Sequence, residues 1–332
     1  MKLIFKILLS LLVILIVAYF LGPKPSTEDI GVSLRKIEIP DSLMELERSI
    51  VESERATHGI KPDNQARIVW ADSTKKSKTK IAFLYLHGFT ASMGDGFPVH
   101  IDLAKKFDAN LYLFRNEHHG VDLGDSTMKG ASVNDFIYGA ERALMIAKKL
   151  GDEVIVVGTS LGGGLAIYLA SQHPEIKAIV LYAPGVGAVD KTADIVTGHW
   201  GYQIGKLALG SEYIFNPDTI KSHLKYWQMR AHLNGVIAGV RVVHAMKKEL
   251  FEKISCPVFL GYYYKNETEQ DKAASVPAML KMYDELGTPP DLKRKIAFPN
   301  SGDHVIASKF ASGDWMAVEE ETYKWLSEVV LK

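Results

Sequence analysis

The sequence predicts an α/β protein with a mainly parallel sheet covered by helices on both faces. From residue 67 onward, short apolar runs alternate with helical patterns, which is typical of strands joined by crossover helices. Most of these runs are continuously apolar, as expected of strands buried on both faces. The 332 residues are 47% hydrophobic and 23% charged, which is the balance of a globular chain with a sizeable core.

Each element follows from a local pattern. The clearest helix is predicted over 132–150, where Ser132 and Asp135 form a capping box before an apolar stripe. The polar run from Ser73 to Lys80 is interpreted as a solvated hairpin loop. Further helices are predicted at 41–58, 275–286 and 314–330, and strands at Arg67–Ala71, Ile81–Leu86, Asn110–Phe114, Glu153–Val157, Lys177–Tyr182, Pro257–Tyr263 and Arg294–Phe298.

Composition excludes several classes of function. Lys plus Arg (39) equals Asp plus Glu (39), so no nucleic-acid partner is expected. Cys256 is the single cysteine, which excludes an internal disulfide framework and any Cys-rich zinc or iron–sulfur site.

The first 26 residues predict a membrane anchor followed by a linker. The stretch from Ile7 to Pro23 carries no charge and, as a helix, reaches roughly 25 Å, enough to cross a thin bilayer. Small residues in a signal-peptidase pattern do not follow it, so an uncleaved anchor is favoured over a cleaved signal peptide or a buried helix. Lys2 and Lys6 precede the span, so Met1 is expected in the cytoplasm and the remaining domain on the outer side, periplasmic or extracellular.

The rest of the chain divides into a peripheral helical segment at 27–66 and one domain at 67–332. Residues 186–250 interrupt the alternation: they contain no strand-like run but many helix formers and large aromatic residues. An insertion that follows a strand of a parallel sheet lies over the crevice where ligands bind, so this segment is predicted to be a lid. Extra helical core is the simpler alternative.

The strongest chemical signal is a serine between two glycines. A strand ending at Val157 leads into Gly158, Thr159, Ser160, Leu161 and Gly162, and a helical pattern follows. A sharp strand-to-helix turn exposes such a serine, and glycines are needed where neighbouring backbones approach closely. We therefore predict Ser160 as a nucleophile.

A serine nucleophile needs a base and an orienting carboxylate, here in the chain order Ser, acid, His. His304 follows the last predicted strand on a glycine-containing loop and is the predicted base. Asp271, before the next helical pattern, is preferred as the acid, with Glu267 and then Glu269 as alternatives. Asp303 is interpreted as a loop residue.

Two N–H groups should stabilise the oxyanion of such an enzyme. The backbone N–H of Leu161 is one candidate, and that of Phe89, in the loop after the strand ending at Leu86, is the other. His87 is expected to fix this loop by hydrogen bonds. The adjacent His118 and His119 lack an acidic partner at ligand spacing, so no metal site is predicted.

These motifs (Leu86 to Phe89, Gly158 to Gly162, and Gly302 to His304), together with a helical insertion between serine and acid, resemble the α/β-hydrolase superfamily. The resemblance is to its monoglyceride lipase and serine-aminopeptidase-like esterase branch, and it covers residues 67–332. It implies an α/β-hydrolase fold with Ser160, Asp271 and His304 as the triad, Phe89 and Leu161 as oxyanion donors, and no cofactor or metal. The family commonly places its acid three residues after a strand-closing glycine, whereas here nine residues separate Gly261 from Asp271.

The expected activity is hydrolysis of an apolar, lipid-like carboxylic ester through an acyl-enzyme. A serine peptidase or an acyltransferase would use the same triad, and a non-catalytic, membrane-tethered binding module is a possibility from another class. The expected partners are a small-molecule ester and the membrane.

Overall fold

A seven-stranded sheet forms the centre of the domain in this computed structural model, which describes residues 2–24 and 36–332. All seven predicted strands are confirmed: β1 (Arg67–Val69), β2 (Thr79–Leu86), β3 (Asn110–Leu113), β4 (Gly151–Thr159), β5 (Ala178–Tyr182), β8 (Val258–Tyr262) and β9 (Lys293–Ala297). Their order is β1-β3-β2-β4-β5-β8-β9, and every neighbouring pair is parallel except β1 with β3. Strand order reverses between β2 and β4, so the loops after these two strands meet at the carboxyl edge of the sheet.

The alternation of side chains along β2 shows how the sheet divides the core. Leu84 and Leu86 pack into one buried cluster, whereas Phe83 and Tyr85 pack into the other. Since successive side chains of a strand point to opposite faces, both faces must be covered by other elements.

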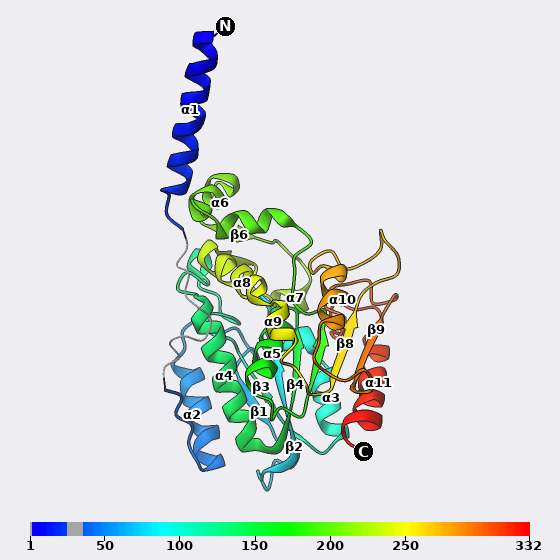
Figure 1. Cartoon of the computed structure of the whole chain (residues 1–332). Coiled ribbons are helices and arrows are strands. Elements are labelled where there is room, and N and C mark those ends of the chain that lie inside the picture. The colour runs from blue at the N-terminus through cyan, green and yellow to red at the C-terminus, as the bar shows by residue number, and fades with distance from the viewer. Residues whose placement is uncertain (1, 25–35) are drawn as a thin grey trace.

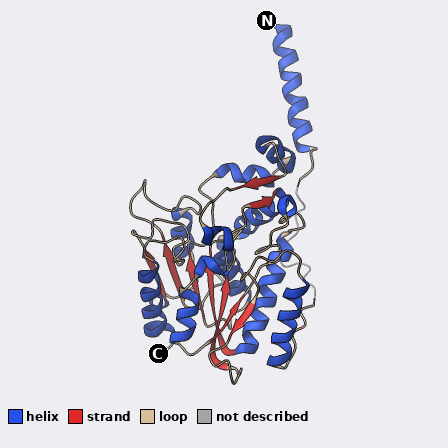
Figure 2. Cartoon of the chain, turned by 180° about the vertical axis from the view of Figure 1, so that it is seen from behind, coloured by secondary structure: helices blue, strands red, loops and turns tan. Residues whose placement is uncertain are grey.

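Helices cover both faces (Figures 1 and 2). Apolar side chains of α4 and α5 contribute to one core cluster and those of α3 and α11 to the other. The predicted capping box of α4 is present, with Ser132 and Asp135 bonding each other's backbone N–H groups. Apart from three helices within the lid, the described α-helices of the domain are α2 (Leu43–Ala56), α3 (Val99–Lys106), α4 (Val133–Leu150), α5 (Leu161–Gln172), α9 (Lys248–Phe251, at the end of the lid), α10 (Val276–Asp284) and α11 (Trp315–Trp325), and a π-helical turn at Leu326–Val330 continues α11.

Helix α2 lies at the edge of the domain beside β1 and α4. Its Leu46 and Ile50 are buried in the core, and Glu54 receives hydrogen bonds from Arg115 at 2.6 Å and 2.9 Å. The helix predicted at 41–58 is therefore present and braces the edge of the sheet. Residues 25–35 of the predicted linker and peripheral segment, like Met1, lie outside the described residues.

The segment predicted as a lid follows β5 and lies over the carboxyl edge of the sheet (Figure 1). One expectation about it was wrong, because residues 186–250 do contain strands: β6 and β7 pair antiparallel. Each has only three residues, too few to show an alternating pattern in the sequence. Its elements are a 3-10 helix (Lys191–Thr197), α6 (Gly201–Leu209), β6 (Tyr213–Phe215), α7 (Lys221–Tyr226), β7 (Arg230–His232) and α8 (Leu233–Ala245).

The prediction of a hairpin loop at Ser73–Lys80 was also wrong. Strand β1 pairs with β3, not with β2, and Thr79 and Lys80 already belong to β2. A polar turn between two apolar runs does not specify which strands pair, because pairing depends on contacts distant in sequence.

Helix α1 (Lys2–Phe20) projects from the domain on the side of the lid (Figure 1). Its segment Leu3–Phe20 has a mean hydropathy of 2.8, and none of it is buried against the rest of the described chain. By length and composition, it is the one helix among the described residues that is able to cross a membrane.

Candidate active site

Ser160 lies at the turn between β4 and α5, in a strained backbone conformation with φ 53° and ψ −117°. Its backbone N–H donates to Tyr182, and its carbonyl accepts from Gly164 and from Gly185 at 2.7 Å. These bonds, made on both sides of the residue, hold it in the strained conformation.

The glycines that flank Ser160 allow three backbone segments to meet. A Cβ on Gly162 would lie 2.0 Å from the carbonyl oxygen of Leu86, and one on Gly158 would lie 2.4 Å from that of Gly162. Only glycine fits at such distances, which is the physical reason for the spacing seen in the sequence.

His304 and Asp271 form a close pair at the same edge of the sheet. His304 Nδ1 lies 2.6 Å from Asp271 Oδ2, and the backbone N–H groups of Ala273 and Ala274 donate to Oδ1. Burial lowers the pKa of His304, but the hydrogen bond and charge of Asp271 outweigh it, so the net pKa is raised above its ordinary value. The imidazole is thus held in one orientation and stabilised when it carries a proton.

The nine residues between Gly261 and Asp271 do not displace the carboxylate, because most of them form a closed excursion. An isolated bridge pairs Tyr264 with Gln270, and the N–H of Asp271 donates to the carbonyl of Tyr263. Asp271 therefore follows the end of β8 almost directly in space.

The two alternative carboxylates lie within this excursion and are exposed. Glu267 accepts a hydrogen bond from the hydroxyl of Tyr264, and Glu269 pairs with Lys265 at 3.0 Å. Asp303 accepts from the N–H of Val305, as expected of a loop residue. Of the carboxylates considered from the sequence, Asp271 is the one that contacts His304.

Ser160 and His304 face a common cavity of about 200 Å3. Its roof comes from α8 of the lid, with Val236, Val240 and Val243, and the surface is largely apolar. The remaining lining comes from the turns after β2, β4, β5 and β8 and from the lid: Phe89, Leu161, Gly185, Gly187, Ala188, Gly239, His244, Ala273 and Ala274.

Leu161 and Phe89, the candidate oxyanion donors, border the cavity. Within the described part of the chain, neither backbone N–H has a hydrogen-bond partner, and Leu161 opens helix α5, where the N–H groups lack intrahelical acceptors. Both groups are thus free to bind an oxygen atom of a substrate.

His87 fixes the loop that carries Phe89. Its Nδ1 lies 2.9 Å from the carbonyl oxygen of Gly88, and the N–H of Asn116 donates to its Nε2. Burial lowers the pKa of His87 to about 4, so the ring is neutral and donates through Nδ1. His119 packs against this ring and is itself buried, with a pKa lowered well below its usual range by desolvation.

Sequence reasoning missed a buried carboxylate behind Ser160. Asp95 accepts hydrogen bonds from the N–H of Gly88 at 2.7 Å and from the hydroxyl of Tyr85 at 2.6 Å, and Tyr85 in turn contacts Thr159. Burial raises the pKa of Asp95 to about 7. This network ties the loop after β2 to the end of β4, but a single Asp within a short 3-10 helix (Met93–Gly96) carries no sequence pattern that would reveal it.

Comparison with known proteins agrees with this architecture. A sequence model described as "Alpha/beta hydrolase family" matches residues 83–318. The chain therefore belongs to the α/β hydrolase family, as its motifs suggested.

Individual relatives lie in the lipolytic part of that family. A thermostable monoacylglycerol lipase of Bacillus sp. (strain H-257) is 28% identical over 182 residues, which is 54% of this chain and 68% of that protein. The fold is similar to that of a metagenome-derived lipolytic enzyme (TM-score 0.65, 15% identity, 81% of this chain and 99% of the other). It is also similar to that of a soluble variant of monoglyceride lipase from Saccharomyces cerevisiae (TM-score 0.60, 14% identity, 92% and 99%).

Proposed function

We propose that this lipase- or esterase-type α/β hydrolase cleaves apolar carboxylic esters through an acyl-enzyme formed on Ser160. The observation that carries the proposal is a strained serine that shares an apolar cavity with a histidine, itself oriented by a buried carboxylate. His304 is the general base and Asp271 its orienting acid. The N–H groups of Leu161 and Phe89 are the oxyanion donors.

The proposed reaction runs in two halves. Ser160 Oγ attacks the ester carbonyl while His304 Nε2 takes its proton, and the carbonyl oxygen, now negatively charged, is stabilised by the two N–H groups. His304 then returns the proton to the departing alcohol, which leaves the acyl group on Ser160. In the second half, His304 takes a proton from water, the hydroxide adds to the acyl carbon, and the proton goes back to Ser160 as the acid leaves. Throughout, the Asp271 carboxylate keeps the proton of the neutral ring on Nδ1.

The cavity favours an apolar acyl group. Its lining is dominated by valine, alanine and glycine, so burial of hydrocarbon there is favourable by about 0.8 kcal/mol per methylene. The activity named for the Bacillus relative, on monoacylglycerols, is consistent with such a substrate.

An apolar ester is favoured over a peptide with a free amino group. Among the described residues that line the cavity, none is a carboxylate, so the lining offers no counter-charge for a substrate ammonium. Acyl transfer differs from hydrolysis only in the nucleophile that attacks the acyl-enzyme. In a non-catalytic binding module, the arrangement of Ser160, His304 and Asp271 would have no function.

We further propose that α1 anchors the enzyme in a membrane, with Met1 in the cytoplasm and the domain on the outer side. The exposed and, from Ile7 onward, uncharged and mainly apolar surface of α1 supports this, because an exposed helix of this kind is unfavourable in water. The positive charges of Lys2 and Lys6 before the span favour the orientation.

Ser160→Ala tests the proposal. In the full-length protein in detergent, this variant should lose at least about a thousandfold of its kcat on a p-nitrophenyl ester and should not react with a fluorophosphonate probe. Ser171→Ala, on the same helix but distant from the cavity lining, is the matched control and should keep both properties. Retained turnover in Ser160→Ala would refute the mechanism, and a series of esters of increasing acyl length would define the chain preferred.

A further inference from the structure

Exposed large apolar side chains are concentrated on one part of the domain. After residue 21, fifteen such side chains are exposed in the described chain, and nine of them lie between residues 189 and 224. These nine are Val189, Ile195, Trp200, Ile204, Leu207, Leu209, Phe215, Ile220 and Leu224. A concentration of this kind on the lid marks an interaction surface rather than the scattered exposure usual for soluble proteins.

Helix α6 carries the most exposed part of this surface. Its Gly201 and Gly205 are buried against the rest of the lid, whereas Leu207 lies on the opposite face and Ile204 is exposed on the flank of the helix. Leu207 is 85% exposed, the highest value among the large apolar side chains of the domain. The helix thus directs a large apolar side chain away from the domain, whereas surface helices usually direct such side chains toward the core.

The lid is bonded directly to the end of the proposed membrane anchor. The indole N–H of Trp200 donates to the carbonyl of Ala18 at 3.0 Å, and the backbone N–H of Trp200 donates to Pro23 at 2.7 Å. His199 lies 3.0 Å from the carbonyl oxygen of Gly22 and packs against the ring of Tyr19. We call these contacts, between residues 18–23 and 198–200, the anchor clamp.

Backbone geometry shows that the clamp is tightly packed. A Cβ on Gly22 would lie 1.8 Å from Trp200 Nε1, so glycine is required for this approach. Trp200 itself has φ 60°, an unusual conformation for a large side chain, at the start of α6. The clamp therefore fixes the start of α6 against the last turn of α1.

Figures 1 and 2 show the consequence for the arrangement of the lid: α6 lies beside the base of α1, at the end of the domain from which α1 projects.

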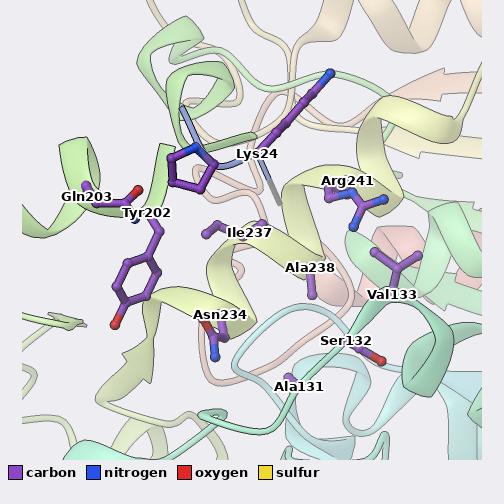
Figure 3. A pocket seen from close by; sticks show the side chains of 11 residues that line it. Lys24, Ala131, Ser132, Val133, Tyr202, Gln203, Asn234, Ile237, Ala238 and Arg241 are labelled. Atoms are coloured by element: carbon purple, nitrogen blue, oxygen red, sulfur yellow. The ribbon is translucent and has the colours of Figure 1, made fainter. Parts of the chain in front are cut away.

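A second cavity, of about 310 Å3, lies between the linker residues Pro23 and Lys24 and helix α8. Tyr202 and Gln203 of α6 border it (Figure 3). It contains neither Ser160 nor His304, so it is distinct from the candidate active site.

We propose that the apolar surface of α6 and its flanking lid residues docks onto the lipid bilayer that α1 spans. The inference rests on the membrane anchoring proposed above. Because the clamp joins the lid to the final turn of the span, α6 lies at the level of the lipid headgroups. Trp and Tyr are the residues that favour this level, and Trp200 and Tyr19 occupy it.

A bilayer fits this surface better than a second copy of the chain does. Trp200, one of the exposed side chains of this surface, is bonded to Ala18 at the end of the exposed apolar helix α1, and a lipid surface covers both at once. Lys24, just after the span, places a positive charge where anionic headgroups attract it. Docking would also place α8, the roof of the catalytic cavity, close to the membrane from which an apolar ester arrives.

Site-specific fluorescence tests the docking. In a Cys256→Ala background, single cysteines replace Leu207 on α6, Val13 within α1, and Met316 on α11 as a matched exposed control. Each carries an environment-sensitive dye, and each full-length protein is reconstituted into vesicles of phosphatidylcholine and phosphatidylglycerol with or without a nitroxide lipid. We expect the label at 207 to shift to the blue and lose about half of its emission to the nitroxide, because interfacial helices lie within ~10 Å of the acyl boundary. The label at 316 should do neither.

The label at 13 separates the possible failures. If it is quenched while the label at 207 remains as solvent-exposed as that at 316, the anchor stands and the docking is overturned. If neither is quenched, the anchor fails and the docking fails with it. If the label at 207 is shielded but not quenched, and cross-links to a second chain, the surface is a contact between copies and the docking is again overturned.

A functional comparison extends the test to catalysis. Leu207→Glu should lower hydrolysis of a long-chain ester embedded in vesicles by about tenfold and leave hydrolysis of a soluble short-chain ester unchanged. Met316→Glu should change neither rate. Gly22→Val, which breaks the clamp without touching α6, should reproduce the effect of Leu207→Glu, and wild-type rates in both variants would contradict the inference.

Discussion

Asp271→Asn exchanges one carboxylate oxygen for an amide group at nearly constant size. In the native site, the N–H groups of Ala273 and Ala274 donate to Oδ1 at 2.8 Å and 2.9 Å, and Oδ2 faces His304. These two donors should hold the amide oxygen of the variant on the Oδ1 side, so its NH2 group faces His304 Nδ1. An NH2 group only donates, so the proton of the ring must move to Nε2. In that tautomer, His304 is unable to take the proton of Ser160.

The expected loss in kcat is about 10³- to 10⁴-fold, equivalent to about 4 to 5.5 kcal/mol of transition-state stabilisation. KM should change little, because Asp271 is buried behind His304 and does not line the cavity. The variant also removes the negative charge that raises the pKa of His304. Burial, which lowers this pKa, is then no longer offset by that charge, so the pKa of His304 falls. The acid limb of the pH–rate profile should then move to lower pH, a change that general loss of structure would not produce.

Steady-state hydrolysis of a p-nitrophenyl ester by the full-length protein in detergent, measured across pH, provides the assay. Glu267→Gln is the matched control, since Glu267 is exposed and its carboxylate accepts a hydrogen bond from Tyr264, not from His304. The kcat of this variant should stay within about twofold of wild type. Similar losses in both variants, or an Asp271→Asn enzyme within tenfold of wild type, would refute the reasoning.

Three further predictions follow from the site. In the wild type, kcat/KM should fall as pH drops below a midpoint above 6.5, because the pKa of His304 is raised and the base must be neutral; a midpoint below 6 would contradict this. Burial raises the pKa of Asp95 to about 7, so the free energy of unfolding of the native chain should fall by up to about 4 kcal/mol as pH rises from 4 to beyond 7. Denaturant unfolding of Asp95→Asn should show a smaller fall over the same pH range. Gly162→Ala, whose Cβ would lie 2.0 Å from the Leu86 carbonyl oxygen, should abolish fluorophosphonate labelling; normal labelling would show that the turn tolerates a side chain.

Several features could be predicted from the sequence because each is encoded in a few neighbouring residues. Short apolar runs, most of them continuous, identified all seven strands of the main sheet, and the capping box located the start of α4 at Ser132. The glycine spacing around Ser160 predicted the turn between β4 and α5, since close backbone approach demands glycine wherever it occurs. The position of His304 followed from chain order along a parallel sheet.

Other features depend on contacts between residues distant in sequence. The sequence left three carboxylates as candidate acids, and the contact of Asp271 with His304 depends on the bridge between Tyr264 and Gln270 that closes the excursion. The pairing of β1 with β3, and of β6 with β7, likewise depends on contacts between separate segments of the chain rather than on the strand propensity of each segment.

The sequence by itself thus determined the layered α/β architecture, the apolar first helix and the glycine-flanked turn at Ser160, because periodicity and turn chemistry are local properties. Only the tertiary structure decided which carboxylate meets the imidazole, how Asp95 ties two loops behind Ser160, and that Trp200 lies against the end of α1. Each of these contacts is specified by the packing of surrounding elements, and the residues that make them carry no local pattern that distinguishes them from their neighbours.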